Sequence, residues 1–184
     1  MMKRLILLVI AGLMMVSTAY AEGKAMPDTM KAGDADLLLN GSGVRTKLFM
    51  DLYVAGLYVP EKTKDVVALL KKDDKMAMRL QIISKLITSE KMSEATREGF
   101  EKSTHGNIAP IQKEIDDMIS VFSAEIKQDD VYDMVYVPGT GTNIIKNGVL
   151  AKTIPGEEFS KALFGIWIGD NPVQEKLKSG LAGS

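Results

Sequence analysis

The chain has 184 residues, of which 46% are hydrophobic, and its 23 lysines and arginines nearly balance its 24 aspartates and glutamates, leaving a formal net charge of −1. That balance carries no electrostatic signature of binding to nucleic acid or to an anionic membrane surface. The sequence contains no cysteine, which excludes disulfides, lipid-modified cysteines, thiolate nucleophiles and thiolate metal ligands. Stability must therefore come from packing.

The first 21 residues have the organisation of a secretory signal peptide. Lys3 and Arg4 precede an apolar run of twelve residues, Leu5–Val16, and the small residues Ala19 and Ala21 mark a cleavage site. The run is shorter than the roughly 20 residues of a membrane-spanning helix, so an uncleaved anchor is the less favoured alternative. Cleavage after Ala21 predicts one exported domain, residues 22–184, in the periplasm or outside the cell.

The mature chain is expected to begin with a loose lead and then to form strands. Residues 44–59 are rich in Val, Leu, Phe and Tyr, follow the turn-forming run Asn40–Gly43 and contain Arg45. We expect a β-hairpin that reverses near Met50–Asp51. The flanking elements predicted are strands at 37–39 and 76–83 and a short helix at 64–72.

Two longer helices are predicted in the middle of the chain. Thr88 or Ser89 can cap the first, which we expect over 89–103. The second is indicated by a stripe of apolar residues at spacings of three and four. The stripe consists of Ile108, Ile111, Ile115, Met118, Ile119, Phe122 and Ile126.

Strands are expected again at 131–137, 143–146 and 149–153. Asn147-Gly148 joins the last two and is the strongest short hairpin signal in the sequence. A helix with an apolar face at 159–167 follows, and a last helix is expected to begin at Pro172 after a cap at Asp170 or Asn171. This order predicts an α+β fold in which helices cover one face of a large antiparallel sheet.

The inventory of reactive side chains argues against ordinary acid–base chemistry. Histidine is the commonest catalytic acid or base, and the chain has one, His105, in the polar turn Ser103–Asn107 between two predicted helices. An exposed structural role is the favoured interpretation of His105. Besides the tyrosines, the sequence offers no obvious tunable group near Arg45, and we predict no cofactor and no metal site.

Two segments resemble the chalcone isomerase-like superfamily. GVRTKLF with LYVAGLYV, within residues 40–60, is similar to an early strand pair of that family, and residues 153–181 are similar to its C-terminal signature. The resemblance implies an open-faced β-sandwich, with a ligand cleft between the antiparallel sheet and the helices. It points to a bacterial, signal-peptide-bearing, non-catalytic branch.

The resemblance also implies that isomerase activity is absent. In true chalcone isomerases the flavonoid cleft contains an arginine and a threonine on early strands, a tyrosine, a lysine and an asparagine on one helix, and a threonine on a late helix. Only the arginine is kept here, as Arg45. The other positions are matched by Tyr53, Met92, Ala95, Gly99 and Ile166. Met92, Ala95 and Gly99 share one helical face, and none can transfer a proton.

Non-catalytic relatives that bind fatty acids suggest a different use for these positions. By that resemblance, Arg45 and Tyr53 would hold a carboxylate head group, which suits a charged planar guanidinium beside a phenol hydroxyl. The apolar slot for the tail would be formed by Met92, Ala95, Gly99 and Ile166, with Ala and Gly leaving room for it. A plain surface role is the structural alternative for Arg45, and a core role is the favoured interpretation of Trp167.

The leading hypothesis is therefore a non-catalytic periplasmic binding protein for a fatty acid or a similar amphipathic carboxylate. Two alternatives remain open: an enzyme of the same fold with an unknown substrate, and a structural or interaction protein of the cell envelope. No nucleic-acid partner and no transmembrane anchor after signal cleavage are expected. The sequence indicates no particular protein partner.

Overall fold

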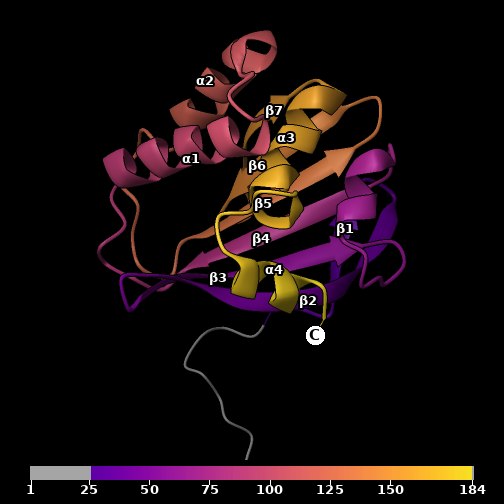
Figure 1. Ribbon diagram of the computed structural model, residues 1–184, viewed down its shortest axis with the longest axis horizontal. Coiled ribbons are helices and arrows are strands. Elements are labelled where there is room, and N and C mark those ends of the chain that lie inside the picture. Colours follow the sequence, from indigo (N-terminus) through magenta and orange to yellow (C-terminus); the bar gives the residue numbers. More distant parts are fainter. Residues whose placement is uncertain (1–25, 184) are drawn as a thin grey trace, which may run out of the picture.

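Within residues 26–183, which the computed structural model describes, seven strands form one antiparallel sheet and the helices pack together on one of its faces (Figure 1). The signal peptide expected at residues 1–21 lies outside the described residues. Neighbouring strands in the sheet are also neighbours in the chain, so every connection is a hairpin or a longer excursion to the next strand. The strands are β1 (Thr29–Ala32), β2 (Ala35–Lys47), β3 (Met50–Val59), β4 (Met76–Ile82), β5 (Val131–Val137), β6 (Gly141–Lys146) and β7 (Val149–Ile154).

The helices are inserted at two points of this meander. Those between β4 and β5 lie over one end of the sheet, and those after β7 lie across its middle and its β2 edge (Figure 1). They are α1 (Ser89–Ser103), α2 (Gln112–Val121), α3 (Glu157–Ile168) and α4 (Glu175–Leu181), with short 3-10 turns η1 (Val67–Lys71) and η2 (Ala109–Ile111). The predicted α+β fold is confirmed.

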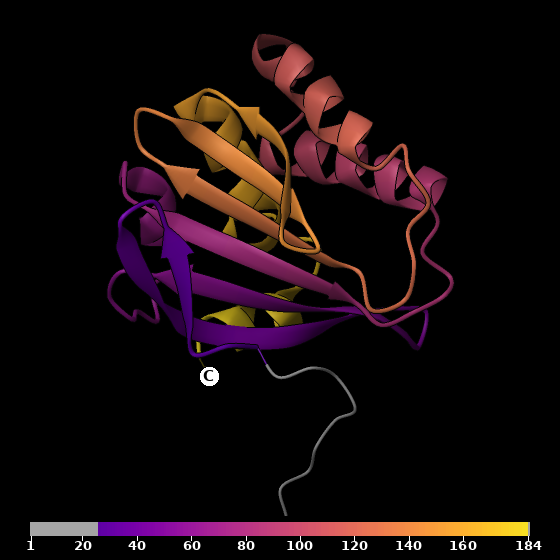
Figure 2. The same cartoon turned by 180° about the vertical axis from the view of Figure 1, so that it is seen from behind.

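The main hydrophobic core lies between the sheet and the helices. Alternate residues of β3 and β4, such as Leu57 and Met78, face Phe100 of α1 and Leu163 of α3, and all four are fully buried. The opposite face carries no helix (Figure 2) and is only partly covered. There β1 supplies Met30 and other residues to a small second cluster, which also contains Leu37, Tyr58, Ala77 and Val135.

One short strand was not predicted, and three helical elements differ from the prediction in their bounds or type. β1 is only four residues long, too short to show a periodic signal, and was expected to be loose lead. The helix predicted over 108–126 is α2 preceded by η2, so the apolar residues after Val121 pack without continuing it. The short helix at 64–72 is the 3-10 turn η1. The last helix begins at Glu175 with Gln174 as its N-cap, three residues after Pro172.

The run Asn40–Gly43 was predicted as a turn, and that prediction is wrong because the run lies inside β2. The side chain of Asn40 is buried and donates to the carbonyl oxygens of Thr63 (2.9 Å) and Leu181 (2.7 Å). At Gly41 the backbone of the C-terminal helix approaches so closely that a Cβ would overlap the carbonyl oxygen of Gly180. These residues serve long-range contacts with α4, which a local turn rule cannot detect.

Two of the hairpins turn through two residues with positive φ. In the β6–β7 turn these are Asn147 (φ 51°) and Gly148 (φ 81°), as the sequence predicts. In the β2–β3 turn they are Leu48 (φ 49°) and Phe49 (φ 65°). The reversal expected near Met50–Asp51 is thus misplaced by two residues. For side chains with a Cβ this left-handed conformation costs about 1–2 kcal/mol per residue.

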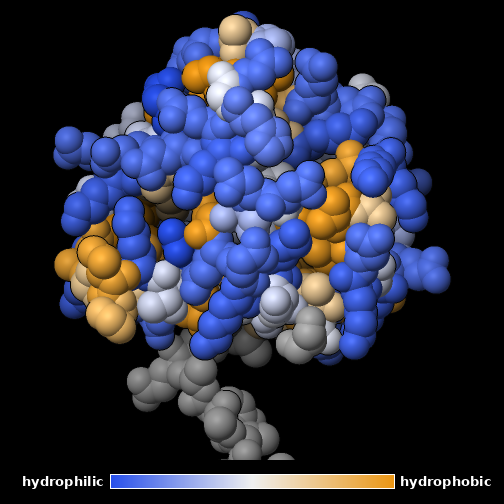
Figure 3. All heavy atoms as spheres, viewed as in Figure 1, coloured by the Kyte–Doolittle hydropathy of each residue, from blue (hydrophilic) through white to orange (hydrophobic). Residues whose placement is uncertain are grey.

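The surface of the helical face is largely hydrophilic (Figure 3). Hydrophobic spheres are visible in several places, and one group projects at the lower left of that view, at the place that Figure 1 gives to the end of the β2–β3 hairpin. The helices within residues 26–183 are all too short or too polar to cross a bilayer.

Candidate functional site

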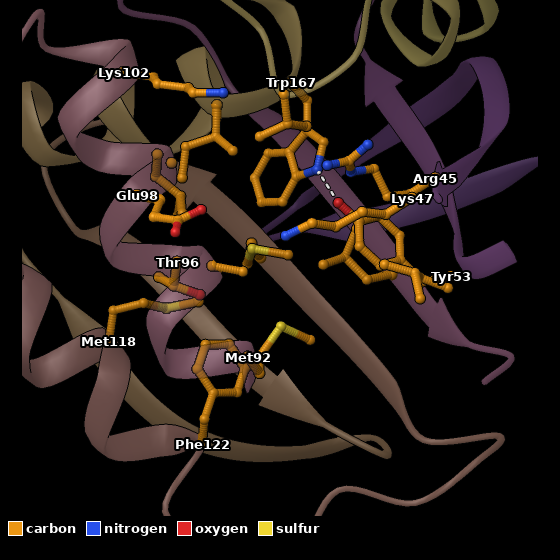
Figure 4. Close-up of a pocket in the computed structure, with 18 residues that line it drawn as sticks. Arg45, Lys47, Tyr53, Met92, Thr96, Glu98, Lys102, Met118, Phe122 and Trp167 are labelled. Atoms are coloured by element: carbon orange, nitrogen blue, oxygen red, sulfur yellow. Dashed lines mark hydrogen bonds between the residues drawn. The ribbon is translucent and has the colours of Figure 1, made fainter. Parts of the chain in front are cut away.

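A cavity of about 110 Å³ lies between the sheet and the helices α1 and α3 (Figure 4). The family resemblance had singled out six positions from four separate elements, and the structure brings all six to the wall of this one cavity. They are Arg45 of β2, Tyr53 of β3, Met92, Ala95 and Gly99 of α1, and Ile166 of α3.

Arg45 is held at the sheet side of the cavity by its neighbours. It pairs directly with Tyr53 across the β2–β3 ladder, which places both side chains on the helical face of the sheet. One guanidinium nitrogen, Nη1, donates to the carbonyl oxygen of Thr46 (2.9 Å) and to Oε1 of Gln174 (3.3 Å). Gln174 Oε1 also accepts from the backbone N–H of Thr46 at 3.0 Å, which fixes its position.

The charge of Arg45 has no ion-pair partner among the described residues. The ion pairs found between residues 26 and 183 involve the other two described arginines, Arg79 and Arg97, and several lysines. Its guanidinium donates to the neutral oxygens of Thr46 and Gln174. A half-buried guanidinium in this state retains strong attraction for an incoming carboxylate.

Tyr53 is oriented by a hydrogen bond from Trp167. The indole Nε1–H of Trp167 donates to the Tyr53 hydroxyl oxygen at 3.0 Å (Figure 4). Since an indole can only donate, Tyr53 acts as acceptor here and its own hydroxyl hydrogen is available to another acceptor. Burial raises the pKa of Tyr53, against the opposing effects of Trp167 and Arg45. The phenol therefore stays protonated and can donate at physiological pH.

Trp167 thus confirms its expected core role and adds a second one. The side chain is 6% exposed and belongs to the main core, and its N–H has found the single partner that a buried indole needs. It also lines the cavity. No local pattern indicates that this partner is Tyr53, because residues 53 and 167 are 114 positions apart in the sequence.

The apolar wall of the cavity is partly as expected. Met92 and Ala95 face the cavity from α1, and further apolar side chains come from β3, β4, β5, α2, α3 and the segments after α2 and α3. The expectation that Gly99 leaves room for a ligand needs correction. A Cβ there would lie 3.0 Å from two carbon atoms of Ile166, so Gly99 mainly allows α1 and α3 to pack closely. The added wall residues are Leu52, Leu80, Met118, Phe122, Met134, Leu163 and Val173.

Polar side chains at the cavity were missed by the sequence interpretation. Lys47, Glu98 and Lys102 line it together with Thr96, and Figure 4 shows Lys47 across from the three residues of α1. Ala95, Glu98 and Lys102 follow the three- and four-residue spacing of a helical face, so the sequence did contain this signal. With Arg45, the cavity carries three cationic groups against one carboxylate, a balance that complements an anionic ligand.

A second, more open hollow of about 500 Å³ adjoins the cavity. The two lie side by side between β3 and α1 and share six wall residues: Lys47, Leu52, Tyr53, Met92, Ala95 and Glu98. The outer hollow extends to the β2–β3 turn at Leu48 and to Leu86 in the loop after β4. We call the two parts the inner cavity and the outer hollow.

His105 lies away from this space. It follows α1 in a left-handed conformation (φ 53°) and lines a different depression beside Lys161 and Asp170. Its position agrees with the exposed turn that we expected. Among residues 26–183, no group of three or more His, Asp or Glu side chains is arranged to hold a metal ion.

Comparisons with known proteins agree with this fold. A family model described as chalcone isomerase-like matches residues 18–183. No curated protein matches the sequence significantly. The crystal structure of a fatty-acid binding protein from Arabidopsis thaliana superposes with a TM-score of 0.68, over 85% of this chain and 90% of that chain, at 17% sequence identity. That likeness shows the shared fold, and the family match shows that the chain belongs to the chalcone isomerase-like family.

Proposed function

We propose that this protein binds a fatty acid or a similar amphipathic carboxylate and does not catalyse its conversion. The observation that carries the proposal is Arg45, a cation without an ion-pair partner among the described residues, beside the donating hydroxyl of Tyr53 at one end of an apolar cavity. We call Arg45 and Tyr53 the clamp. A carboxylate placed there would receive charge-assisted hydrogen bonds in a partly desolvated site.

The sizes of the two spaces support a division of the ligand between them. The inner cavity, at about 110 Å³, is smaller than the roughly 300–1,000 Å³ of ordinary ligand pockets, whereas the outer hollow, at about 500 Å³, is within that range. The head group would occupy the inner cavity. The tail would pass Met92 and Ala95, which line both spaces, and continue into the outer hollow.

The structural neighbour from Arabidopsis thaliana supports the choice of ligand class, since it is a fatty-acid binding protein with this fold. The N-terminal sequence supports export, with cleavage after Ala21 and a periplasmic or secreted mature protein. Together these features favour an exported carrier or sensor of an acidic lipid.

An enzyme of the same fold is the second candidate, and one observation favours it. We expected no tunable group near Arg45 other than tyrosine, but Glu98 and two lysines line the same cavity. A carboxylate beside amines could serve acid–base chemistry. The positions that face the cavity at Met92, Ala95 and Gly99 still offer no proton donor, which favours binding.

Calorimetry on the mature protein tests the proposal. Saturated acids of increasing chain length should bind with rising affinity, by up to about 0.8 kcal/mol per buried methylene, until the two spaces are full. Each acid should bind more tightly than the alcohol of equal length. Equal affinity for acid and alcohol would contradict a carboxylate site. Mass spectrometry of the recovered ligand serves as the control, because a chemically altered ligand would favour the enzyme.

Replacing Tyr53 with phenylalanine should weaken binding of the acid by about 0.5–1.5 kcal/mol, the usual net value of one neutral hydrogen bond. The ring remains, so the core should keep its packing. Tyr58→Phe is the matched control, because Tyr58 is a buried tyrosine of the same strand whose hydroxyl lies on the other face of the sheet. Calorimetry should find unchanged affinity for Tyr58→Phe; equal losses in the two variants would rule out a contact from Tyr53 to the ligand.

A further inference from the structure

The end of the β2–β3 hairpin carries large apolar side chains that are unusually exposed. Phe49 is 102% exposed relative to the reference residue, Leu48 76% and Met50 42%. Leu86, from the loop between β4 and α1, is 47% exposed and lines the same hollow as Leu48 and Met50. We call Leu48, Phe49, Met50 and Leu86 the apolar tip; it corresponds to the hydrophobic projection in Figure 3.

The backbone conformation at the tip disfavours the two side chains found in the turn. The β6–β7 turn has the same two-residue, positive-φ geometry and contains Asn147-Gly148, the residues that suit it. The β2–β3 turn places Leu48 and Phe49 in those positions. Neither side chain is buried in the fold, so packing within the protein does not account for them.

The tip stands at the mouth of the ligand space. Leu48, Met50 and Leu86 line the outer hollow, and the hollow opens between this hairpin and α1. A lipid tail that enters or leaves the hollow therefore passes the tip. Any surface that delivers such a tail must itself be apolar at the point of contact.

The charges beside the tip indicate which surface this is. Lys47 precedes Leu48, Lys85 precedes Leu86, and Lys91 lines the hollow and donates to the carbonyl oxygen of Leu86 at 3.3 Å; all three are exposed. The two acids that line the hollow, Glu94 and Glu98, lie further along α1. The nearest acid in the hairpin, Asp51, accepts a hydrogen bond from Thr46. Exposed lysines around an inserted apolar tip complement anionic lipid head groups. The near-zero net charge of the whole chain conceals this local arrangement.

We propose that the apolar tip docks on a lipid bilayer that contains anionic lipid, so that the ligand passes between the membrane and the outer hollow. The identity of the ligand rests on the proposed function, whereas the docking of the tip on a bilayer does not depend on it. A protein partner fits the tip less well, because four side chains from a hairpin end and a neighbouring loop cannot by themselves form the 1,200–2,000 Å² of a standard interface. Insertion between lipid head groups needs only a few apolar side chains.

Vesicle binding by the ligand-free mature protein tests the proposal, with Phe49→Gly as the main variant. Glycine suits the positive φ of this position, so the variant should fold at least as well as the parent. Phe49 does not line either ligand space, so calorimetry with the acid should give an affinity within about twofold of the parent. Binding to vesicles of phosphatidylcholine with phosphatidylglycerol should fall about tenfold, the loss expected for one inserted aromatic side chain.

Two further variants test whether vesicle binding depends on the apolar tip. Phe49→Trp should retain vesicle binding and show a blue-shifted fluorescence on insertion. Val149→Ser with Leu150→Ser removes two other exposed apolar side chains, 70% and 57% exposed, from the β6–β7 hairpin and should leave vesicle binding unchanged. Pure phosphatidylcholine vesicles should bind the parent more weakly than the mixed vesicles.

Several outcomes would overturn docking on a bilayer. These are a parent protein that binds neither vesicle, a Phe49→Gly variant that binds as well as the parent, and a concentration-dependent dimer that the variant abolishes. Failure of the proposed function looks different: the acid preference in calorimetry would be missing while vesicle binding and its loss in Phe49→Gly remained.

Discussion

Replacing Gly41 with alanine is expected to lower the free energy of unfolding by about 3 kcal/mol, near the upper end of overpacking costs. A Cβ at this position would overlap the carbonyl oxygen of Gly180 and would lie 2.6 Å from the amide nitrogen of Gly183 and 2.7 Å from the carbonyl oxygen of Leu181. These are backbone atoms at the end of α4, so relief requires the whole helix to move. The usual gain of about 0.4–1 kcal/mol from replacing a glycine offsets only part of this cost.

Gly43→Ala is the matched control for this effect. It lies two residues further along β2, on the same face, and its nearest neighbour would be a methyl carbon of Leu177 at 3.0 Å, the flexible end of a side chain. Urea unfolding should show a much smaller loss for Gly43→Ala. Similar losses in the two variants would mean that the contact between β2 and the end of α4 is not the source of the effect.

The same displacement should reach the ligand site. Gln174 immediately precedes α4 and accepts hydrogen bonds from Arg45 and from the backbone of Thr46. If α4 moves away from β2, the guanidinium loses the support that fixes its direction. Folded Gly41→Ala protein should therefore also bind the acid more weakly, whereas Gly43→Ala should bind it nearly normally.

Local sequence signals predicted those elements whose cause is local. The helix expected over 89–103 is α1 with the same bounds, because Thr88 supplies an N-cap that accepts from the backbone of Lys91. The β6–β7 turn followed from Asn147-Gly148, and β5 was found with its observed bounds. In each case a few neighbouring residues decide the conformation.

Local signals failed where a distant segment decides the conformation. Asn40–Gly43 has the composition of a turn, but its residues remain in β2 because Asn40 bonds to Leu181 and Gly41 packs against Gly180. The turn at Leu48-Phe49 was predicted two residues too late, because no residue with a turn preference marks it. Its residues are poor turn formers, and the cross-strand register of β2 and β3 sets its place.

The candidate site divides in a similar way. The resemblance placed six residues on one cavity wall, which no periodic pattern could have done, because they come from β2, β3, α1 and α3. Helical spacing from Ala95 could have predicted Glu98 and Lys102 as cavity residues, but the sequence interpretation did not include them. Gln174 and the partner of Trp167 were beyond sequence reasoning, since each depends on how α4 and α3 meet the sheet.

Arg45→Ala should weaken binding of a fatty acid by about 1.5–3 kcal/mol, or roughly ten- to a hundred-fold, the range for hydrogen bonds to a charged group. The matched alcohol should lose much less, so the preference for the acid should nearly vanish. Arg45→Lys keeps the charge but not the planar fork and should fall between the parent and Arg45→Ala. Calorimetry with one acid and its alcohol measures all three proteins on the same scale.

Two other cations provide the controls that assign the effect to Arg45. Arg97 is an exposed arginine of α1 that pairs with Asp116 outside the cavity, so Arg97→Ala should leave the affinity for the acid unchanged. Lys47 lines both ligand spaces and offers a competing position for the head group. If the preference for the acid survived Arg45→Ala but disappeared in Lys47→Ala, the carboxylate would bind at the cavity mouth, and the clamp of Arg45 and Tyr53 would be wrong.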